Sequence, residues 1–381
     1  MSDCFIFFLP HRNGGVDTFI QNYVNTITER KIKVVKYKII DGLFSKIRKT
    51  NIDSKEKIEI AFSKHSSQMS RFKLLRKLIT ERDILICNDS FELEFINYFK
   101  LKNKIVYMLH GDLNHYNNIL KNNYTIIDQV FCVSDGLKKK YEQIFPQLKF
   151  EVSHPFVSNQ VKRREHSNEL LKCIFIGRFE YLKGADLFLE LVSVFKNNID
   201  WNVITLSEES EQNLLDRIPG NVKIYKDISN EKVLDILAEM DVLIFPSRSE
   251  GFGIAVLEAL TQGVVPIVLD IPIGIPDQVI DSYNGFVIKS ENWNEQATMH
   301  LKNLIASRSL LTEMKNNGMK FAKKGFDSKL IVSKFVDQIN NIILNKEKIF
   351  NDIKISFLEK IFPEPLYRLM KMINAKMKYG R

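Results

Sequence analysis

The chain has 381 residues, of which 45% are hydrophobic and 27% charged, so it is long enough for two domains with buried cores. This composition excludes a disordered or collagen-like chain, and no apolar run approaches the roughly 18–20 residues that cross a bilayer. The net charge of +9 divides by count into +8 over residues 1–160, −4 over 161–344 and +5 over 345–381. A basic first half and a basic tail suggest an anionic partner, either nucleic acid or a membrane surface.

The first half alternates short apolar runs with stretches of helical period. Strands are predicted over 4–9, 33–40, 83–87, 104–109 and 129–134, and helices over 15–30, 69–82 and 135–144. Continuous apolar strands separated by helices are typical of a parallel sheet that is buried on both faces. The four cysteines lie in such apolar runs without CxxC spacing, so we expect reduced core thiols.

The second half repeats this plan. Strands are predicted over 171–177, 201–206, 222–226, 241–247 and 265–270, and helices over 183–196, 230–240 and 253–262. A polar segment, 154–169, separates the two series and is the predicted linker. We therefore expect two doubly wound α/β domains, 1–155 and 170–340, which face each other across a cleft and bind ligands at the carboxyl ends of their strands.

After residue 326 the chain is predicted to be helical, and residues 345–381 form a basic tail. Its last stretch begins at Pro363 and Pro365 and has one apolar and one basic face. The apolar positions are Leu366, Leu369, Met370, Ile373 and Met377, and the basic ones are Arg368, Lys371, Lys376 and Lys378. Such a helix either docks on the protein's own first domain or lies on anionic lipid.

The most informative segment is FPSRSEGFGIAVLEALTQGVVPIVLD, residues 245–270. A predicted strand ends at Pro246, and Glu250, Gly251, Phe252 and Gly253 then open a helix. Glycines at a strand-to-helix turn let the backbone approach a ligand closely, and the N–H groups of the first helical turn favour a diphosphate. Glu258 lies inside the helix, so the two carboxylates can accept hydrogen bonds from sugar hydroxyls at the two ends of one ligand.

This string closely resembles the signature of retaining glycosyltransferases of family four, which have the GT-B fold. In it, Glu250 and Glu258 are separated by seven residues and followed by Ala259, Gly263 and Pro266. The resemblance implies that Glu250 contacts the donor sugar and that Glu258 binds the ribose of the nucleotide. It covers roughly residues 5–345 and is strongest in the second half.

A second motif agrees with the first. In IGRFEYLKGADLFLE, residues 176–190, Arg178 follows a predicted strand and Lys183 precedes the next helix. Two cations at the carboxyl end of a parallel strand suit an anion between them. This motif is similar to the Gly-Arg…Lys-Gly element of the family, which implies that Arg178 and Lys183 hold the diphosphate.

The first half offers weaker matches. Gly14 and Gly15 form a turn between a predicted strand and helix, where the family's first loop reaches the phosphates and the acceptor. His110 follows a predicted strand, and the family often has a histidine here, near the reactive carbon of the sugar. A generic turn and a structural histidine remain the alternatives.

Two segments depart from the family pattern. The usual Gly-Gly-x-x-Glu loop is replaced by IPIGIPD, residues 271–277, in which Asp277 stands for Glu and one Gly is missing. The Asn-Gly often found near the linker is replaced by SHPF, residues 153–156. These departures bear on the nucleotide pocket and on the choice of donor.

The sequence thus predicts a GT-B enzyme that moves a hexose from a nucleotide diphosphate sugar, with a uridine diphosphate sugar favoured, to a glycan or lipid-linked glycan with retention. A Lys-, Asn- and Ile-rich composition suggests an AT-rich bacterial genome, hence lipopolysaccharide, O-antigen or capsule synthesis. The alternatives are a catalytically silent sugar-nucleotide-binding subunit and a GT-B phosphorylase or epimerase.

The expected partners follow from what the sequence lacks. No Asp-x-Asp motif is found, so we expect neither a metal nor another cofactor. No nucleic-acid-binding motif accompanies the dispersed lysines, so an anionic membrane surface is the favoured partner. The first residues lack the basic segment and cleavage site of a secretory signal, so we expect a cytoplasmic protein at the inner face of the membrane.

Overall fold

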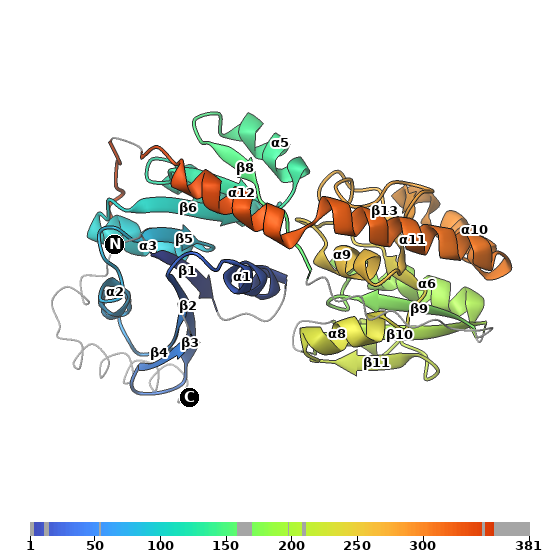
Figure 1. The fold of residues 1–381 in the computed structure, drawn as a ribbon. Coiled ribbons are helices and arrows are strands. Elements are labelled where there is room, and N and C mark those ends of the chain that lie inside the picture. Colours follow the sequence, from blue (N-terminus) through green and yellow to red (C-terminus); the bar gives the residue numbers. More distant parts are fainter. Residues whose placement is uncertain are drawn as a thin grey trace. The chain divides into compact units, whose positions relative to one another are not determined.

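Figure 1 shows the computed structural model, which describes residues 4–10, 15–52, 55–157, 170–196, 198–207, 211–344 and 347–353. The chain forms two compact units. The first comprises residues 1–131, 141–151 and 335–381, and the second comprises residues 132–140 and 152–334. Each unit is built on a largely parallel sheet with helices packed on it, so the predicted α/β class is confirmed.

The sheet of the first unit has the strand order β3-β4-β2-β1-β5-β6-β7-β8. Its strands are β1 (Phe5–Pro10), β2 (Ile32–Ile40), β3 (Lys46–Ile52), β4 (Lys55–Ser63), β5 (Ile84–Cys87), β6 (Lys104–Leu109), β7 (Gln129–Cys132) and β8 (Phe150–Val152). The helices are α1 (Gly15–Thr26), α2 (Gln68–Arg76), α3 (Ser90–Phe99), α4 (Asn114–Asn123) and α5 (Asp135–Ile144). β1 is buried and pairs parallel with both β2 and β5, as its continuous apolar sequence predicts.

Strands β3 and β4 were not predicted. They form an antiparallel pair at the edge of the sheet, and β4 also pairs parallel with β2. Their sequences, KIRKTNI and KEKIEIAFS, mix lysines with isoleucines instead of forming an apolar run. Lysines are usual in edge strands because charge discourages pairing with another chain, so the charge hid the strand pattern.

The sheet of the second unit has the order β11-β10-β9-β12-β13-β14, and its neighbouring strands pair in parallel. The strands are β9 (Leu171–Ile176), β10 (Ile199–Thr205), β11 (Lys223–Lys226), β12 (Val242–Phe245), β13 (Val265–Leu269) and β14 (Phe286–Ile288). The helices are η1 (Tyr181–Lys183), α6 (Ala185–Phe195), α7 (Gln212–Leu215), α8 (Asn230–Leu237), α9 (Ile254–Thr261), η2 (Ser290–Asn292), α10 (Trp293–Ala306), α11 (Arg308–Gly325) and α12 (Ser328–Asn340). The strand order reverses between β9 and β12, where doubly wound sheets bind ligands.

The end of the described chain belongs to the first unit, from Phe335 within α12 onward. The Phe335 ring contacts the rings of Tyr23 and Phe131 edge-on, at 5.0 and 4.8 Å between centroids. Farther along, the Lys348 Nζ donates to Asp128 Oδ2 at 2.5 Å. Residues 335–344 and 347–353 therefore complete the core of the first unit. Gly14, residues 158–169 of the linker and residues 354–381 of the tail lie outside the described residues.

Two further expectations concern the core and the membrane. All four cysteines are buried free thiols, as predicted. In the part of the chain that the structure describes, no helix combines the length and the apolar character needed to cross a bilayer.

Candidate functional site

The candidate site lies where the strand order of the second sheet reverses. β9 ends at Ile176 and is followed by Arg178 and Lys183, whereas β12 ends at Phe245 and is followed by Glu250. Strands β9 and β12 are parallel neighbours, so both loops leave the same edge of the sheet. Lys183 and Glu250, which are 67 residues apart in sequence, thus meet at one place.

Lys183 and Glu250 form an ion pair at the centre of this site. The Lys183 Nζ donates to Glu250 Oε1 at 2.6 Å and lies 3.5 Å from the Ser249 carbonyl oxygen. The two side chains are 18% and 11% exposed, so the pair is largely shielded and yet open on one side. A cation held in this way by a carboxylate is oriented before any ligand arrives.

A close contact between the two loops fixes the position of Lys183. Gly184 has a φ of +73°, and a Cβ there would lie 2.1 Å from the Pro246 carbonyl oxygen. The Arg248 guanidinium donates to both carboxylate oxygens of Asp186 at 2.8 Å, and its carbon lies 3.8 Å from the centre of the Tyr181 ring. Arg248 thereby binds the 246–249 loop to the turn that carries Lys183.

The N-terminus of α9 opens onto the same edge. Gly253 precedes the helix with a φ of +88°, a left-handed conformation that glycine adopts without strain. The Gln278 amide donates to the Phe252 carbonyl at 2.5 Å and to the Gly274 carbonyl at 3.2 Å. These bonds hold the 250–253 turn against the 271–277 loop. The first turn of α9 therefore presents its N–H groups from a fixed backbone, as an anion site requires.

The side chain of Phe252 lies in the core of the second unit. Its ring is 3% exposed and packs against the rings of His154 and Phe326, with centroids 5.8 and 5.6 Å away. The sequence places Phe252 among the ligand-binding residues, and the structure shows that its side chain is a core contact under the loop.

Glu258 lies in the second turn of α9 and is 5% exposed. Its Oε1 accepts a hydrogen bond from the Asn230 Nδ2 at 2.7 Å. Burial raises the pKa of Glu258 to about 7, and the hydrogen bond from Asn230 opposes this rise only in part. Asn230, at the start of α8, was not predicted, because a single asparagine carries no sequence signal of a contact 28 residues away.

Arg178 lies beside Glu180, with 3.1 Å between its NH2 and the Glu180 Oε1, and its side chain is 38% exposed. It follows β9 at the same sheet edge as Lys183 and is the more exposed of the two predicted cations. Arg178 therefore lies at the rim of the site, whereas Lys183 lies in its interior.

The predicted residues of the first unit follow its own strands. His110 comes directly after β6, and its Nε2 lies 2.6 Å from the Asn88 Oδ1. The Asn88 amide donates to the Phe8 carbonyl at 2.6 Å, so its oxygen faces His110 and the proton must be on the His110 Nε2. Burial lowers the pKa of His110 to about 4, which keeps the ring neutral at pH 7. Gly15 is the first residue of α1.

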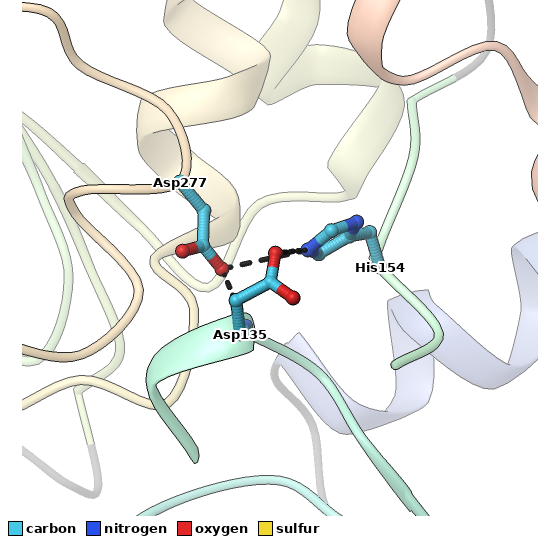
Figure 2. A group of neighbouring side chains, drawn as sticks. All are labelled: Asp135, His154 and Asp277. Carbon is cyan, nitrogen blue, oxygen red and sulfur yellow. Dashed lines mark hydrogen bonds and ion pairs between the residues drawn. The ribbon is translucent and has the colours of Figure 1, made fainter. Parts of the chain in front are cut away.

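The two departures from the family pattern meet in one cluster, which Figure 2 shows. The His154 Nε2 lies 3.4 Å from the Oδ2 atoms of both Asp135 and Asp277, and the Asp135 N–H donates to the Asp277 Oδ2 at 2.9 Å. Their possible metal-ligand atoms lie within 4.8 Å of one another. The two segments that depart from the family pattern, 153–156 and 271–277, are thus in contact through His154 and Asp277. No local sequence pattern reveals this contact.

The comparisons agree with this geometry. Residues 158–321 match the family model of glycosyl transferases group 1. An uncharacterized glycosyltransferase of Methanocaldococcus jannaschii is 23% identical over 343 residues, which cover 82% of this chain and 90% of that protein. A capsular polysaccharide biosynthesis glycosyltransferase of Staphylococcus aureus is 26% identical over 204 residues, about half of either chain.

Among solved structures, one described as trehalose-6-phosphate from E. coli bound with UDP-2-fluoro glucose is similar with a TM-score of 0.70. It is 10% identical, and the match covers 90% of this chain and 100% of that one. This likeness shows the GT-B fold that the sequence predicts. The family match and the named relatives support a glycosyltransferase related to group 1.

Proposed function

We propose that the protein is a retaining glycosyltransferase that moves a hexose from a uridine diphosphate sugar to a glycan or lipid-linked glycan. The observation that carries the proposal is the Lys183–Glu250 pair beside the N-terminus of α9. This pair brings a cation and a carboxylate together with a helix N-terminus where the strand order reverses, which suits the diphosphate and the sugar of one donor. The similar structure with a bound UDP-sugar analogue supports the choice of donor.

The reaction needs charge stabilisation more than a nucleophile of the protein. The acceptor hydroxyl attacks the anomeric carbon on the face that the diphosphate leaves. The bond from that carbon to the phosphate oxygen breaks, and the leaving phosphate takes the proton of the hydroxyl. Lys183, Arg178 and the N–H groups of α9 stabilise the growing negative charge, so the proposal requires no metal ion. Glu250 orients the hexose and Glu258 holds the ribose, and the role of His110 is the one that the family resemblance implies.

The biological setting is a second part of the proposal. The capsular relative and the Lys-, Asn- and Ile-rich amino-acid composition favour bacterial surface polysaccharide synthesis, as in lipopolysaccharide, O-antigen or capsule. The basic first 160 residues and the basic tail favour peripheral attachment to the anionic inner face of the cell membrane. We therefore expect salt-sensitive binding to anionic vesicles. Deleting 363–381, or neutralising Arg71, Lys73, Arg76 and Lys77, should reduce this binding.

A donor screen tests the enzymatic proposal. The protein is incubated with a panel of nucleotide sugars and simple glycan acceptors, and the anomeric configuration of the product is read by proton NMR. We expect turnover with a UDP-hexose and an axial linkage from an axial donor. A product of inverted anomeric configuration would contradict retention. Binding of a nucleotide sugar without turnover on any acceptor of the panel would favour the catalytically silent subunit.

Lys183→Ala tests where the diphosphate lies. Loss of a preorganised charge-stabilising donor lowers turnover by about 10²–10³-fold. Lys289→Ala is the control, because Lys289 is an exposed lysine of the same unit outside the site. Full activity of the Lys183 variant would place the diphosphate elsewhere.

A further inference from the structure

The loop between β2 and β3 exposes apolar side chains to solvent. Leu43 is 53% exposed and Phe44 is 70% exposed, and they are flanked by Ile39 at 61% and Ile47 at 44%. These four residues, here named the β2–β3 patch, lie close together along the chain. Large apolar side chains gathered in this way mark an interaction surface, whereas single exposed ones need no explanation.

The loop is held rigidly at its base. The Ser63 hydroxyl donates to the Gly42 carbonyl at 2.6 Å, and the Ser63 N–H donates to the Ser45 hydroxyl at 3.0 Å. The Lys64 N–H donates to the Ile40 carbonyl at 2.8 Å. Because the end of β4 fixes both ends of the loop, Leu43 and Phe44 are presented outward without a large loss of chain entropy on binding.

Cations surround the patch. Ala61 of β4 is the register partner of Lys38 on β2 and, on its other side, of Lys46 on β3. Both lysines are exposed, and their backbones lie about 10 Å apart, two strand spacings, across Ala61. Asp41, the one acidic residue of the loop, is paired with Lys64. Two exposed lysines, Lys38 and Lys46, therefore lie beside the apolar tip, and the only acidic side chain of the loop is already neutralised by Lys64.

Helix α2, which follows, contributes little to this surface. The Arg71 guanidinium donates to the Ser66 hydroxyl at 2.9 Å and to the Ser63 carbonyl at 3.2 Å, and Arg76 donates to the Ile79 carbonyl at 2.9 Å. Arg71 and Arg76, two of the four cations named above for vesicle binding, thus hold α2 in place. The exposed apolar residues lie in the β2–β3 loop instead, since Phe72 and Leu75 of α2 are buried.

The patch lies at the edge of the sheet that carries His110. β2, β1, β5 and β6 are consecutive parallel strands, so the loop after β2 and His110 after β6 leave the same edge about 14 Å apart laterally. A surface that receives Leu43 and Phe44 would run beside the acceptor side of this unit.

We propose that the β2–β3 patch inserts into the headgroup region of an anionic bilayer, with Leu43 and Phe44 as the inserted side chains and Lys38 and Lys46 on lipid phosphates. This inference rests on the proposed function, because it makes the acceptor a lipid-linked one delivered along the membrane surface. The charge of the surface favours an anionic bilayer as the partner, because an apolar tip flanked by lysines matches an interface of acyl chains and anionic headgroups.

A tryptophan reporter tests insertion directly. Trp201 and Trp293 are 0% and 1% exposed, so a full-length Phe44→Trp protein adds one exposed tryptophan to a constant background. With phosphatidylglycerol vesicles carrying brominated acyl chains, we expect a blue shift and quenching of the added emission, and neither with phosphatidylcholine vesicles. Leu330→Trp is the matched control, because Leu330 is also 70% exposed and lies on α12.

Loss of binding tests the flanking lysines and the apolar side chains separately. Replacing Lys38 and Lys46 by Gln should lower the vesicle partition coefficient about 30-fold, from about 1 kcal/mol for each cation. Replacing Leu43 and Phe44 by Ser should lower it about tenfold or more. The control variant carries Lys329→Gln, Leu330→Ser and Lys334→Gln on α12, where the same chemical changes should leave partitioning unchanged.

Several outcomes would overturn the inference. They are no quenching by the anionic vesicles, equal quenching of the Leu330→Trp protein, unchanged partitioning of both patch variants, or a blue-shifted emission of the introduced tryptophan before vesicles are added. Self-association detected by sedimentation, and abolished by the Leu43 and Phe44 changes, would make the patch a contact between copies. UDP titration of each variant separates these results from a failure of the proposed function, since nucleotide binding belongs to the other unit.

Discussion

Glu258 is the residue whose chemistry depends most on its surroundings. Buried in α9 with Asn230 as its hydrogen-bond partner, it has a pKa raised to about 7. A carboxyl that is protonated in about half of the molecules near neutral pH is a poor acceptor for two ribose hydroxyls until it ionises. The affinity of the site for a nucleotide should therefore depend on pH in the range where this group titrates.

We expect Glu258→Gln to weaken UDP binding about 10–100-fold at pH 8, since hydrogen bonds to charged groups contribute about 1.5–3 kcal/mol. The ratio of wild-type to variant affinity should shrink as the pH falls through about 7, because protonation removes the charge in the wild type. Titration calorimetry at pH 6, 7 and 8 measures this ratio, and the titration of the UDP phosphate cancels within it. A ratio that stays constant would contradict the ribose assignment.

The raised pKa of Glu258 also affects stability. Because its folded pKa is above its unfolded value of 4.5, its contribution to stability is fully present below pH 4.5 and is lost as the pH rises through about 7. The unfolding free energy of Glu258→Gln minus that of the wild type should therefore be larger at pH 8 than at pH 5, as measured by urea unfolding. The same difference at both pH values would contradict the assigned pKa.

At the scale of elements, the site depends on how closely two loops approach. Gly184→Ala places a Cβ against the Pro246 carbonyl and forces an alanine into a φ of +73°. We expect a loss of about 2–5 kcal/mol in unfolding free energy and a weaker nucleotide affinity, because the 181–184 turn must move away with Lys183. Gly220→Ala is the control, since a Cβ there meets nothing within 4 Å. Equal stability of the two variants would show that the loops are not tightly coupled.

The sequence predicted the elements of the site better than their mutual contacts. The strand-turn-helix segments around Lys183 and Glu250 could be recognised because apolar strands and glycine turns are local patterns. The contacts of Arg248 with Asp186, of Gln278 with Phe252 and of Asn230 with Glu258 could not, since each joins residues 26 or more positions apart. The β3–β4 pair was missed because an edge strand needs no continuous apolar run.

At the scale of the whole molecule, the chain returns to its first unit after completing the second. Lys348 is 5% exposed and Asp128 is fully buried, and Asp128 also accepts from the Ile105 N–H at 2.8 Å. Burial lowers the pKa of Lys348, and the neighbouring Asp128 opposes that shift. The sequence suggested that a basic tail docks on the first domain or on lipid, but a single buried lysine cannot be distinguished by pattern from its exposed neighbours.

Lys348→Met should cost about 3–5 kcal/mol of unfolding free energy, because it leaves the Asp128 carboxylate buried without its cation. Lys223→Met is the control: its partner Asp200 lies at 2.9 Å, but the lysine is 59% exposed, so about 0–1 kcal/mol is expected. Urea unfolding of both variants, followed by circular dichroism, measures the difference. If Lys348→Met unfolds like the control, residues 347–353 are not part of the core of the first unit.

The central claim is that a nucleoside diphosphate binds where β9 and β12 diverge, on Lys183, Glu258 and the N-terminus of α9. Titration calorimetry of UDP into the full-length wild type and into the Lys183→Ala, Glu258→Gln and Lys289→Ala variants tests it most directly. The account predicts one binding site per chain, weakened in the first two variants and unchanged in Lys289→Ala. Wild-type affinity for UDP in both the Lys183 and Glu258 variants, or no binding of any nucleoside diphosphate to the wild type, would contradict it.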